Sequence, residues 1–209
     1  MLSAGVLTFQ EFIRHEPLPL ATIQDAVLNF LRNRDDVVLF GAHAVNAYVS
    51  EPRMTQDIDL LSLHAKEFAL KLQDYLRQQF HIAVRVREIS KGKGYRIYQI
   101  QKSGNRHLVD VRPVETLPLA QRIEQVLVVA PAELIATKVI SYYQRRGQPK
   151  AGTDWRDVAI LLLTFPELKS ETSPVVDRLI AAGVGQEVLD TWKEIVSQEI
   201  RSPEDGDEF

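Results

Sequence analysis

The stretch that decides the fold is Val38-Leu-Phe-Gly-Ala-His-Ala-Val-Asn-Ala-Tyr-Val-Ser-Glu-Pro-Arg-Met-Thr-Gln-Asp-Ile-Asp-Leu60. A short apolar strand runs into Gly41, an alanine-rich helix follows, and after Pro52 the chain returns as a strand that carries Asp57 and Asp59. Glycine at a strand-to-helix turn allows a backbone or a phosphate to approach closely. The free N–H groups of the following helix point to the same place. The stretch therefore predicts a phosphate-binding turn beside a carboxylate-bearing strand.

Two carboxylates on one strand face predict a metal site. Asp57 and Asp59 stand two residues apart, so both side chains leave the same face, while Ile58 points into the core. Carboxylates this close repel each other unless a cation lies between them. Hard oxygen ligands suit Mg²⁺ ions that bridge triphosphate oxygens, so we expect Mg²⁺ here.

A third carboxylate would complete a two-metal site, and Asp110 is the best candidate. It is the acid within the largely apolar run His107-Leu-Val-Asp-Val-Arg112, and strict strand alternation places Leu108 on its face. We expect this run to be a central strand next to the first two carboxylates. The alternative is a surface carboxylate that pairs with Arg106 or Arg112.

Apolar periodicity and turn residues predict the remaining elements. They indicate an α+β fold, with a mixed β-sheet packed by helices and an all-helical C-terminal segment. The expected boundaries are an α/β core over residues 1–130, helices packed on it over 131–201, and a disordered acidic tail over 202–209. Helices are expected over 9–13, 20–32, 42–49, 65–79, 132–145, 154–164, 174–182 and 186–200. Strands are expected over 36–41, 57–61, 82–87, 95–101, 107–111 and 125–129.

Composition excludes several classes of site. The 209-residue chain contains no cysteine, which rules out disulfides, thiolate metal sites and cysteine nucleophiles. We find neither a secretory signal nor an apolar stretch of about 20 residues that could span a membrane, so we expect a cytoplasmic protein. The histidines show no metal-ligand spacing, which argues against zinc. We interpret His43 as a hydrogen-bonded structural histidine.

Charge is unevenly distributed along the chain. The net charge is −3, yet the segment Arg85–Arg112 holds eight lysines and arginines against two acids. A local basic face binds phosphates even on a mildly acidic protein. The segment is therefore either an acceptor-binding face or the solvated surface of β-hairpins.

The stretch quoted above resembles the first two motifs of minimal nucleotidyltransferases of the DNA polymerase β superfamily. Those motifs read roughly as an apolar strand, Gly-Gly or Gly-Ser, a helix, and Arg-x-Thr-x-Asp-x-Asp. Further along, Glu133-Leu-Ile-Ala-Thr-Lys138, Arg145 and Asp154-Trp-Arg-Asp157 resemble the downstream Lys-and-Asp motif of the AbiEii-type toxin branch. The resemblance covers about three fifths of the chain, from Val37 to Leu163.

The resemblance implies transfer of a nucleoside monophosphate from an NTP to an acceptor hydroxyl on RNA, such as tRNA, or on protein. It implies two Mg²⁺ ions, an antitoxin protein as a partner, and no membrane. The same resemblance assigns the site residues. The metal-binding and catalytic residues are Asp57, Asp59 and Asp110, and the nucleotide-binding residues are Gly41, Ala42, Arg53, Thr55 and Lys138. Asp157 is a supporting polar residue that alternatively pairs with Arg145 or Arg156, and Asp154 is alternatively an acid near a helix N-cap.

One departure from the family pattern keeps other interpretations open. The chain has Ala42 where the family has glycine or serine, so this position offers a phosphate only its backbone N–H. A catalytically silent relative that binds a nucleotide or a protein is one alternative. Transfer to a small molecule such as an aminoglycoside is another. A glycosyltransferase shares the Asp-x-Asp pattern but needs a larger domain before it.

Overall fold

The computed structural model describes residues 18–89, 92–102 and 104–201. The chain forms two compact units, and the main division between them falls between Val129 and Ala130. Unit 1 holds the described residues before Tyr48 and those of 51–129, and unit 2 holds 48–50 and the described residues from 130 onward. The helix expected over 9–13 and the acidic tail lie outside the described residues.

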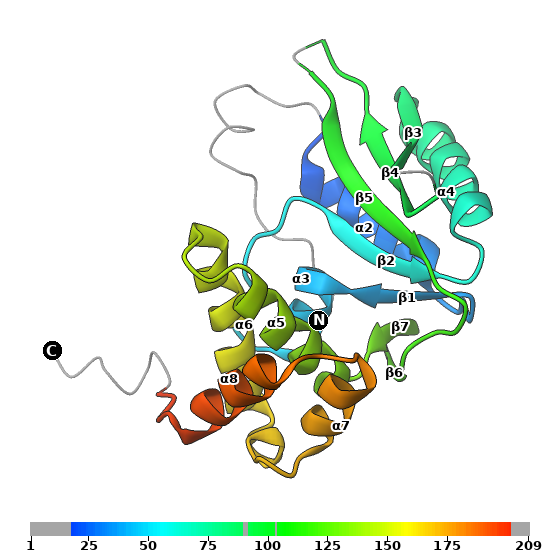
Figure 1. Cartoon of the computed structure of the whole chain (residues 1–209). Coiled ribbons are helices and arrows are strands. Elements are labelled where there is room, and N and C mark those ends of the chain that lie inside the picture. Colours follow the sequence, from blue (N-terminus) through cyan, green and yellow to red (C-terminus); the bar gives the residue numbers. More distant parts are fainter. Residues whose placement is uncertain (1–17, 90–91, 103, 202–209) are drawn as a thin grey trace, which may run out of the picture. The chain divides into compact units, whose positions relative to one another are not determined.

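Unit 1 is built on a seven-stranded mixed sheet with the order β3-β4-β5-β2-β1-β7-β6 (Figure 1). The central pair β2 and β5 is parallel, as is the pair β1 and β7, and the other neighbours are antiparallel. The strands are β1 (Val37–Phe40), β2 (Ile58–Ser62), β3 (Val84–Ile89), β4 (Gly94–Gln99), β5 (Arg106–Pro113), β6 (Ala120–Ile123) and β7 (Val126–Val129).

Helices cover one face of this sheet and leave side chains exposed on the other. Helix α4 (Ala65–Phe80) contacts β2 to β5, and α2 (Leu20–Leu31) contacts β5 and β7; both lie behind the strands in Figure 1. Burial alternates along β2, where Ile58 and Leu60 are fully buried and the intervening residues are not. This period of two identifies a strand with one apolar face and one polar face. The carboxylates leave from the polar face.

Unit 2 is helical within the described residues. Its helices are α5 (Pro131–Gln144), α6 (Pro149–Thr164), α7 (Pro174–Ala181) and α8 (Gln186–Ser197), with a short 3₁₀ helix η1 (Pro166–Leu168). Proline suits the first turn of a helix because the N–H that it lacks has no partner there. Trp192 is 1% exposed and anchors the core, and its indole N–H donates to the Ser170 carbonyl.

The structure corrects two of the expected elements. Strand β6 was not predicted, because this edge strand pairs only with β7 and is largely exposed, so its sequence shows little apolar alternation. Helix α6 begins at Pro149, not at Asp154, so residues between the two helices expected over 132–145 and 154–164 also form a helical turn. No helix in the described residues has the length and apolar content needed to cross a membrane.

Candidate active site

The three predicted carboxylates lie on neighbouring strands of unit 1. Asp59 is the register partner of Phe40 on β1 and of Asp110 on β5. Asp57 directly precedes β2 and lies on the same face. The sequence prediction that Asp110 occupies a central strand beside the first two carboxylates is thus confirmed, whereas their roles as ligands stay predictions.

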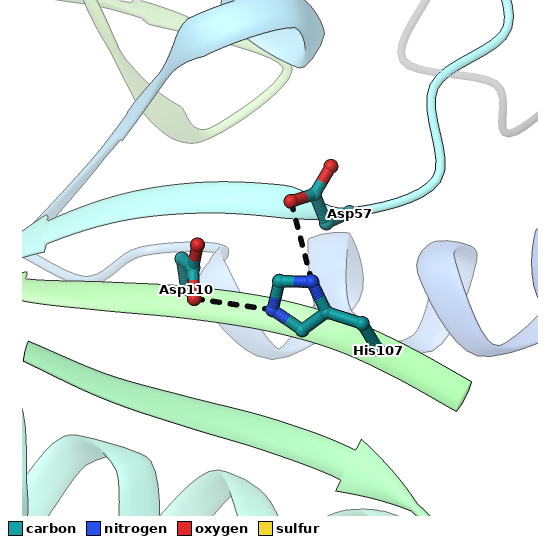
Figure 2. A group of neighbouring side chains, drawn as sticks. All are labelled: Asp57, His107 and Asp110. Carbon is teal, nitrogen blue, oxygen red and sulfur yellow. Dashed lines mark hydrogen bonds and ion pairs between the residues drawn. The ribbon is translucent and has the colours of Figure 1, made fainter. Parts of the chain in front are cut away.

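His107 bridges two of these acids, as Figure 2 shows. Its Nδ1 lies 3.4 Å from Asp57 Oδ2, and its Nε2 lies 3.1 Å from Asp110 Oδ1. Within the part of the chain that the structure describes, these three residues form the one group of histidine and acidic side chains whose ligand atoms all lie within 4.8 Å of one another. The spacing of the histidines argued against zinc, and that stays a prediction; the position of His107 beside two acids was not expected from the sequence.

A β-bulge explains why alternation missed this histidine. On β4, Ile97 pairs with Val109 while the next residue, Tyr98, pairs with His107, so Leu108 is an extra residue in β5. The extra residue shifts the alternation of faces, and His107 reaches the face of Asp110 although the two stand three residues apart. Bulges re-aim side chains in this way and are common next to active sites.

Arg96 is the second partner of Asp110, where the sequence suggested Arg106 or Arg112. Its Nε donates to Asp110 Oδ1 at 2.9 Å. Arg112 instead approaches Asp59 at 4.0 Å and lies over the ring of Phe40. Each of the two acids on facing strands therefore has its own arginine.

The surroundings of Asp110 favour its ionised form. Burial has the largest single effect on Asp110 and acts to raise its pKa, but the hydrogen bonds and charges of His107 and Arg96 together outweigh burial, so the pKa is lowered. The pKa of His107 is raised, first by its hydrogen bond to Asp110 and further by the charges of Asp110 and Asp57. The two acids thus favour the protonated form of the imidazole that lies between them.

Gly41 allows the close packing of the turn against Asp59. Its φ of +71° is a conformation that L side chains rarely adopt. A Cβ at this position would lie 2.2 Å from Asp59 Oδ2. Helix α3 (Gly41–Tyr48) begins here, so its first N–H groups start beside the carboxylate cluster. The adjacent Ala42 is a buried residue in the helix. The position in this turn that requires glycine is 41, and glycine is present there.

Two polar side chains outside the predicted site fix the connection from α3 to β2. Asn46 donates to the Arg53 carbonyl at 2.8 Å and accepts from the Arg53 N–H at 3.1 Å. Gln24, buried on α2, donates to the Thr55 carbonyl at 3.0 Å and also contacts the Gln56 carbonyl. These bonds hold the backbone on either side of Met54.

Thr55 has a local structural role and lies close to the cluster. Its hydroxyl donates to the carbonyl of Asp57 at 3.3 Å, directly before β2. Because Gln24 holds the Thr55 carbonyl and Thr55 holds that of Asp57, the start of the carboxylate strand is fixed by successive bonds. Sequence patterns alone gave no signal for Gln24, which is one polar position on an apolar helix face.

His43 is buried in the first turns of α3 without the hydrogen bond that we expected. Among the described residues its Nε2 has no hydrogen-bond partner. Burial, followed by the charge of Arg53, lowers its pKa to about 4. The imidazole is therefore neutral at physiological pH, and the hydrogen bond that we expected is missing at Nε2.

Lys138 lies in unit 2 and forms a buried ion-pair network there. Its ammonium contacts Asp157 Oδ2 at 2.7 Å and Asp154 Oδ1 at 3.8 Å. Arg145 binds Asp154 at 2.6 Å, and Arg156 approaches Asp157 at 3.9 Å. Asp154 lies inside α6 and not near its N-cap. The lysine and the acids of the downstream motif are thus in direct contact.

The donor set of unit 1 fits a divalent cation. Asp57, His107 and Asp110 each offer one ligand atom, these atoms lie within 4.8 Å of one another, and Asp59 lies at the register position beside Asp110. Carboxylate oxygens are the ligands that Mg²⁺ prefers. The His107 nitrogen extends the donor set toward metals that accept imidazole.

Comparisons with known proteins bear on the family and the fold of the chain. The model of a family described as "Nucleotidyl transferase AbiEii toxin, Type IV TA system" matches residues 25–190. A search of curated proteins found no match.

Two solved structures share the fold at low sequence identity. The Megavirus polyadenylate synthase matches with a TM-score of 0.59 and 14% identity over 76% of this chain, which spans only 36% of that chain. The structure of JHP933 from Helicobacter pylori matches with a TM-score of 0.53 and 14% identity, over 91% of this chain and 92% of that one. The predicted α+β nucleotidyltransferase fold is confirmed.

Proposed function

The chain belongs to the AbiEii nucleotidyltransferase family and is a nucleotidyltransferase; from this premise we propose that it moves a nucleoside monophosphate from an NTP to a hydroxyl of an RNA acceptor, with Mg²⁺. The observation that carries the metal dependence is the placement of Asp57, Asp59 and Asp110 on one face of the parallel pair β2 and β5. Exposed arginines on β3 and β4 of the same sheet, Arg85, Arg87 and Arg96, support RNA as the acceptor.

The reaction forms one bond and breaks one. The acceptor oxygen attacks the α-phosphorus of the NTP, the bond from that phosphorus to the bridging oxygen breaks, and pyrophosphate leaves with the electron pair. Divalent ions held by the three carboxylates would neutralise the triphosphate and make the acceptor hydroxyl more acidic. The chain's own residues bind, orient and take up the proton.

Each predicted site residue of unit 1 has a proposed role that follows from its position. The Gly41 turn and the N-terminus of α3 receive phosphate oxygens beside Asp59. Asp110 helps to deprotonate the acceptor hydroxyl, and His107 and Arg96 fix its carboxylate through hydrogen bonds. Arg53 and Thr55 shape the nucleotide pocket, and their backbone is held by Asn46 and Gln24. A nucleotide-binding role for Lys138 stays a prediction.

The family description also motivates a biological role. We infer that the protein acts as the toxin of a toxin–antitoxin pair, with an antitoxin protein as its partner. Induced expression of the wild type should then arrest growth of a bacterial host. Expression of Asp57→Ala/Asp59→Ala at the same level should not.

Transfer of radiolabel from each α-labelled NTP tests the activity itself. The acceptors are total tRNA, a protein extract and buffer alone, with and without Mg²⁺. The variant Asp57→Ala/Asp59→Ala removes the carboxylates of β2. The matched control, Asp74→Ala/Asp190→Ala, removes two exposed acids of helices α4 and α8.

We expect Mg²⁺-dependent labelling of RNA that the control retains and the active-site variant loses. Labelling of protein would overturn the RNA assignment while keeping the reaction. Absence of labelling with every NTP, together with Mg²⁺-dependent nucleotide binding, would instead support a catalytically silent relative.

A further inference from the structure

Two rows of side chains run across four strands on the polar face of the sheet. In the first row, Arg87 on β3 opposes Arg96 on β4, which opposes Asp110 on β5, which opposes Asp59 on β2. Directly opposed residues share a face of a sheet. The row therefore begins with two arginines and ends at two carboxylates.

The second row lies beside the first and has the same polarity. Arg85 on β3 opposes Tyr98 on β4, and Tyr98 opposes His107 on β5. The rings of Tyr98 and His107 are 5.2 Å apart between centroids, and His107 contacts Asp57. This row joins an edge arginine, an aromatic ring and the carboxylate cluster.

The basic end of both rows is exposed. Arg85, Arg87 and Arg96 are exposed and Tyr98 is partly exposed, whereas Val84 and Ile97, which point to the other face, are buried. Helix α4 packs on that other face, where Gln73 donates to the Val84 carbonyl. The polar face of β3 and β4 is thus an accessible surface of unit 1.

The charges on this surface are poorly balanced within the described residues. There, the guanidinium groups of Arg85 and Arg87 form no hydrogen bond or ion pair with another described residue. Arg87 also faces Arg96 directly, and like charges opposed across two strands destabilise a sheet. A phosphate placed between such arginines relieves the repulsion.

The strand order separates this surface from the phosphate-binding turn. Along the order β3-β4-β5-β2-β1, the carboxylates lie in the middle, Gly41 follows β1 on one side, and the arginine rows extend to β3 on the other. Arg87 is two strands from Asp110, about 10 Å at a spacing of about 4.8 Å per strand. An NTP with its phosphates at Gly41 would leave the β3–β4 side to the acceptor.

We propose that this face of β3 and β4 binds the single-stranded 3′ end of the RNA acceptor, with a base stacked on Tyr98 and phosphates held by Arg85 and Arg87. The inference deepens the proposed function and rests on it, because it assigns the acceptor subsite of the same active site. Aromatic rings beside a basic track are the elements by which proteins bind single strands. The terminal hydroxyl then lies toward Asp110.

Binding of a short, 5′-fluorescein-labelled single-stranded RNA, measured by fluorescence anisotropy without NTP, tests the subsite independently of catalysis. Tyr98→Ala should weaken binding about tenfold, the loss of one base–aromatic stack, while Tyr98→Phe should retain it. Arg85→Ala/Arg87→Ala should also lower the slope of log affinity against log salt by about 1.4, for two lost phosphate contacts.

The matched control removes two cations from the opposite side of the sheet. Lys66→Ala/Arg77→Ala on α4 should leave both the affinity and the salt slope unchanged. Circular dichroism and thermal unfolding show whether each variant is folded. Equal binding by wild type, Tyr98→Ala and Arg85→Ala/Arg87→Ala would overturn the proposal, as would equal binding of a blunt duplex of the same sequence.

Steady-state kinetics with RNA and NTP varied separately distinguish the acceptor from the nucleotide. Tyr98→Ala should raise the KM for RNA about tenfold and leave the KM for NTP unchanged. A rise confined to the NTP would show that the face holds the nucleotide and would overturn the proposal. If the wild type binds RNA through Tyr98 but transfers no label to it, the subsite stands and the proposed function falls.

Discussion

Gly41 shows how a single residue connects the fold to the site. Its positive φ closes the turn from β1 into α3, and its missing side chain leaves room for the Asp59 carboxylate. The place of Gly41 between a strand and a helix predicted that it forms a turn with close backbone approach. The pattern could not predict that the neighbour requiring the space is Asp59.

Substitution of Gly41 by alanine should therefore damage both stability and activity. Strain at positive φ destabilises a fold by about 1 to 3 kcal/mol. The added Cβ also forces Asp59 away from its position, and misplacement by about 1 Å lowers rates about a hundredfold.

Gly183→Ala is the matched control, because Gly183 has a φ of +67° and an added Cβ there would meet no atom within 4 Å. Chemical denaturation should show that both variants are destabilised, and label transfer should show a rate loss only for Gly41→Ala.

His43 makes folding sensitive to acid. Its pKa in the folded protein is about 4, against about 6.5 for an unperturbed histidine. As the pH falls, the unfolded chain therefore binds this proton first. The contribution of His43 to the free energy of unfolding is therefore fully present above about pH 6.5. It falls by about 3 kcal/mol as the pH decreases from about 6.5 to 4.

Denaturant unfolding at a series of pH values measures this effect. The decrease in unfolding free energy from pH 7 to 4 should be about 3 kcal/mol smaller in His43→Gln than in the wild type. His64→Gln, at an exposed histidine, should behave like the wild type. If His43→Gln and wild type lose equal stability over this range, His43 is not a neutral buried group.

His107 marks the limit of what strand alternation predicts. Asp57, Asp59 and Asp110 followed from spacing and from an acid in an apolar run, and the structure brings them onto adjacent strands. His107 did not follow, because Leu108 adds a residue whose bulge depends on pairing with β4. A register shift of this kind is set by tertiary contacts, so one strand's sequence does not reveal it.

At the scale of elements, the connection between α3 and β2 is held by side chains from its surroundings. Gln24 comes from α2 and Asn46 from α3, and their amides bond backbone groups of Arg53, Thr55 and Gln56. The bonds place the start of the carboxylate strand. We interpret Gln24 as a positioning residue that acts through Asp57.

Gln24→Leu should loosen this connection without disrupting the sheet. Loss of the amide leaves the Thr55 carbonyl without its donor, which destabilises the protein by about 1 to 3 kcal/mol. Hydrogen exchange should increase at the amides of 55–57, and kcat should fall. Gln73→Leu is the control, since its amide holds the Val84 carbonyl on the edge strand β3, away from the carboxylates. Equal effects on kcat in both variants would assign Gln24 a general structural role.

Element prediction succeeded where periodicity is strong and failed where context decides. The apolar faces of α2 and α4 and the buried strands β1 and β2 gave clear signals, and the predicted ends of all four elements agree with the structure within one residue. Edge strand β6 carries few apolar residues, and the first turn of α6 contains a glycine and a proline. The formation of β6 and of this helical turn depends on strand pairing and on packing, which cannot be predicted from the local composition.

At the scale of the whole molecule, each unit has its own cluster of charged groups. In unit 1, Asp57 and Asp59 are partly exposed and Asp110 is buried, whereas Lys138 and Asp157 of unit 2 are buried together. A buried ion pair contributes little net stability, yet removal of one partner leaves an unpaired buried charge and destabilises by about 3 to 5 kcal/mol. The pair is therefore best tested by removing its members singly and together.

A double-mutant cycle separates structure from nucleotide binding at Lys138. Lys138→Met and Asp157→Asn should each destabilise the protein, and the double variant should be more stable than the sum predicts because neither member of this pair is left buried without the other. The exposed pair Lys71 and Glu67 provides a control, because the coupling of a solvated surface pair should be much weaker. If Lys138 serves only the fold, activity should recover in the double variant together with stability. If its ammonium binds the NTP, the double variant should be stable and still show a raised KM for the NTP, which would support the nucleotide-binding role predicted from the sequence.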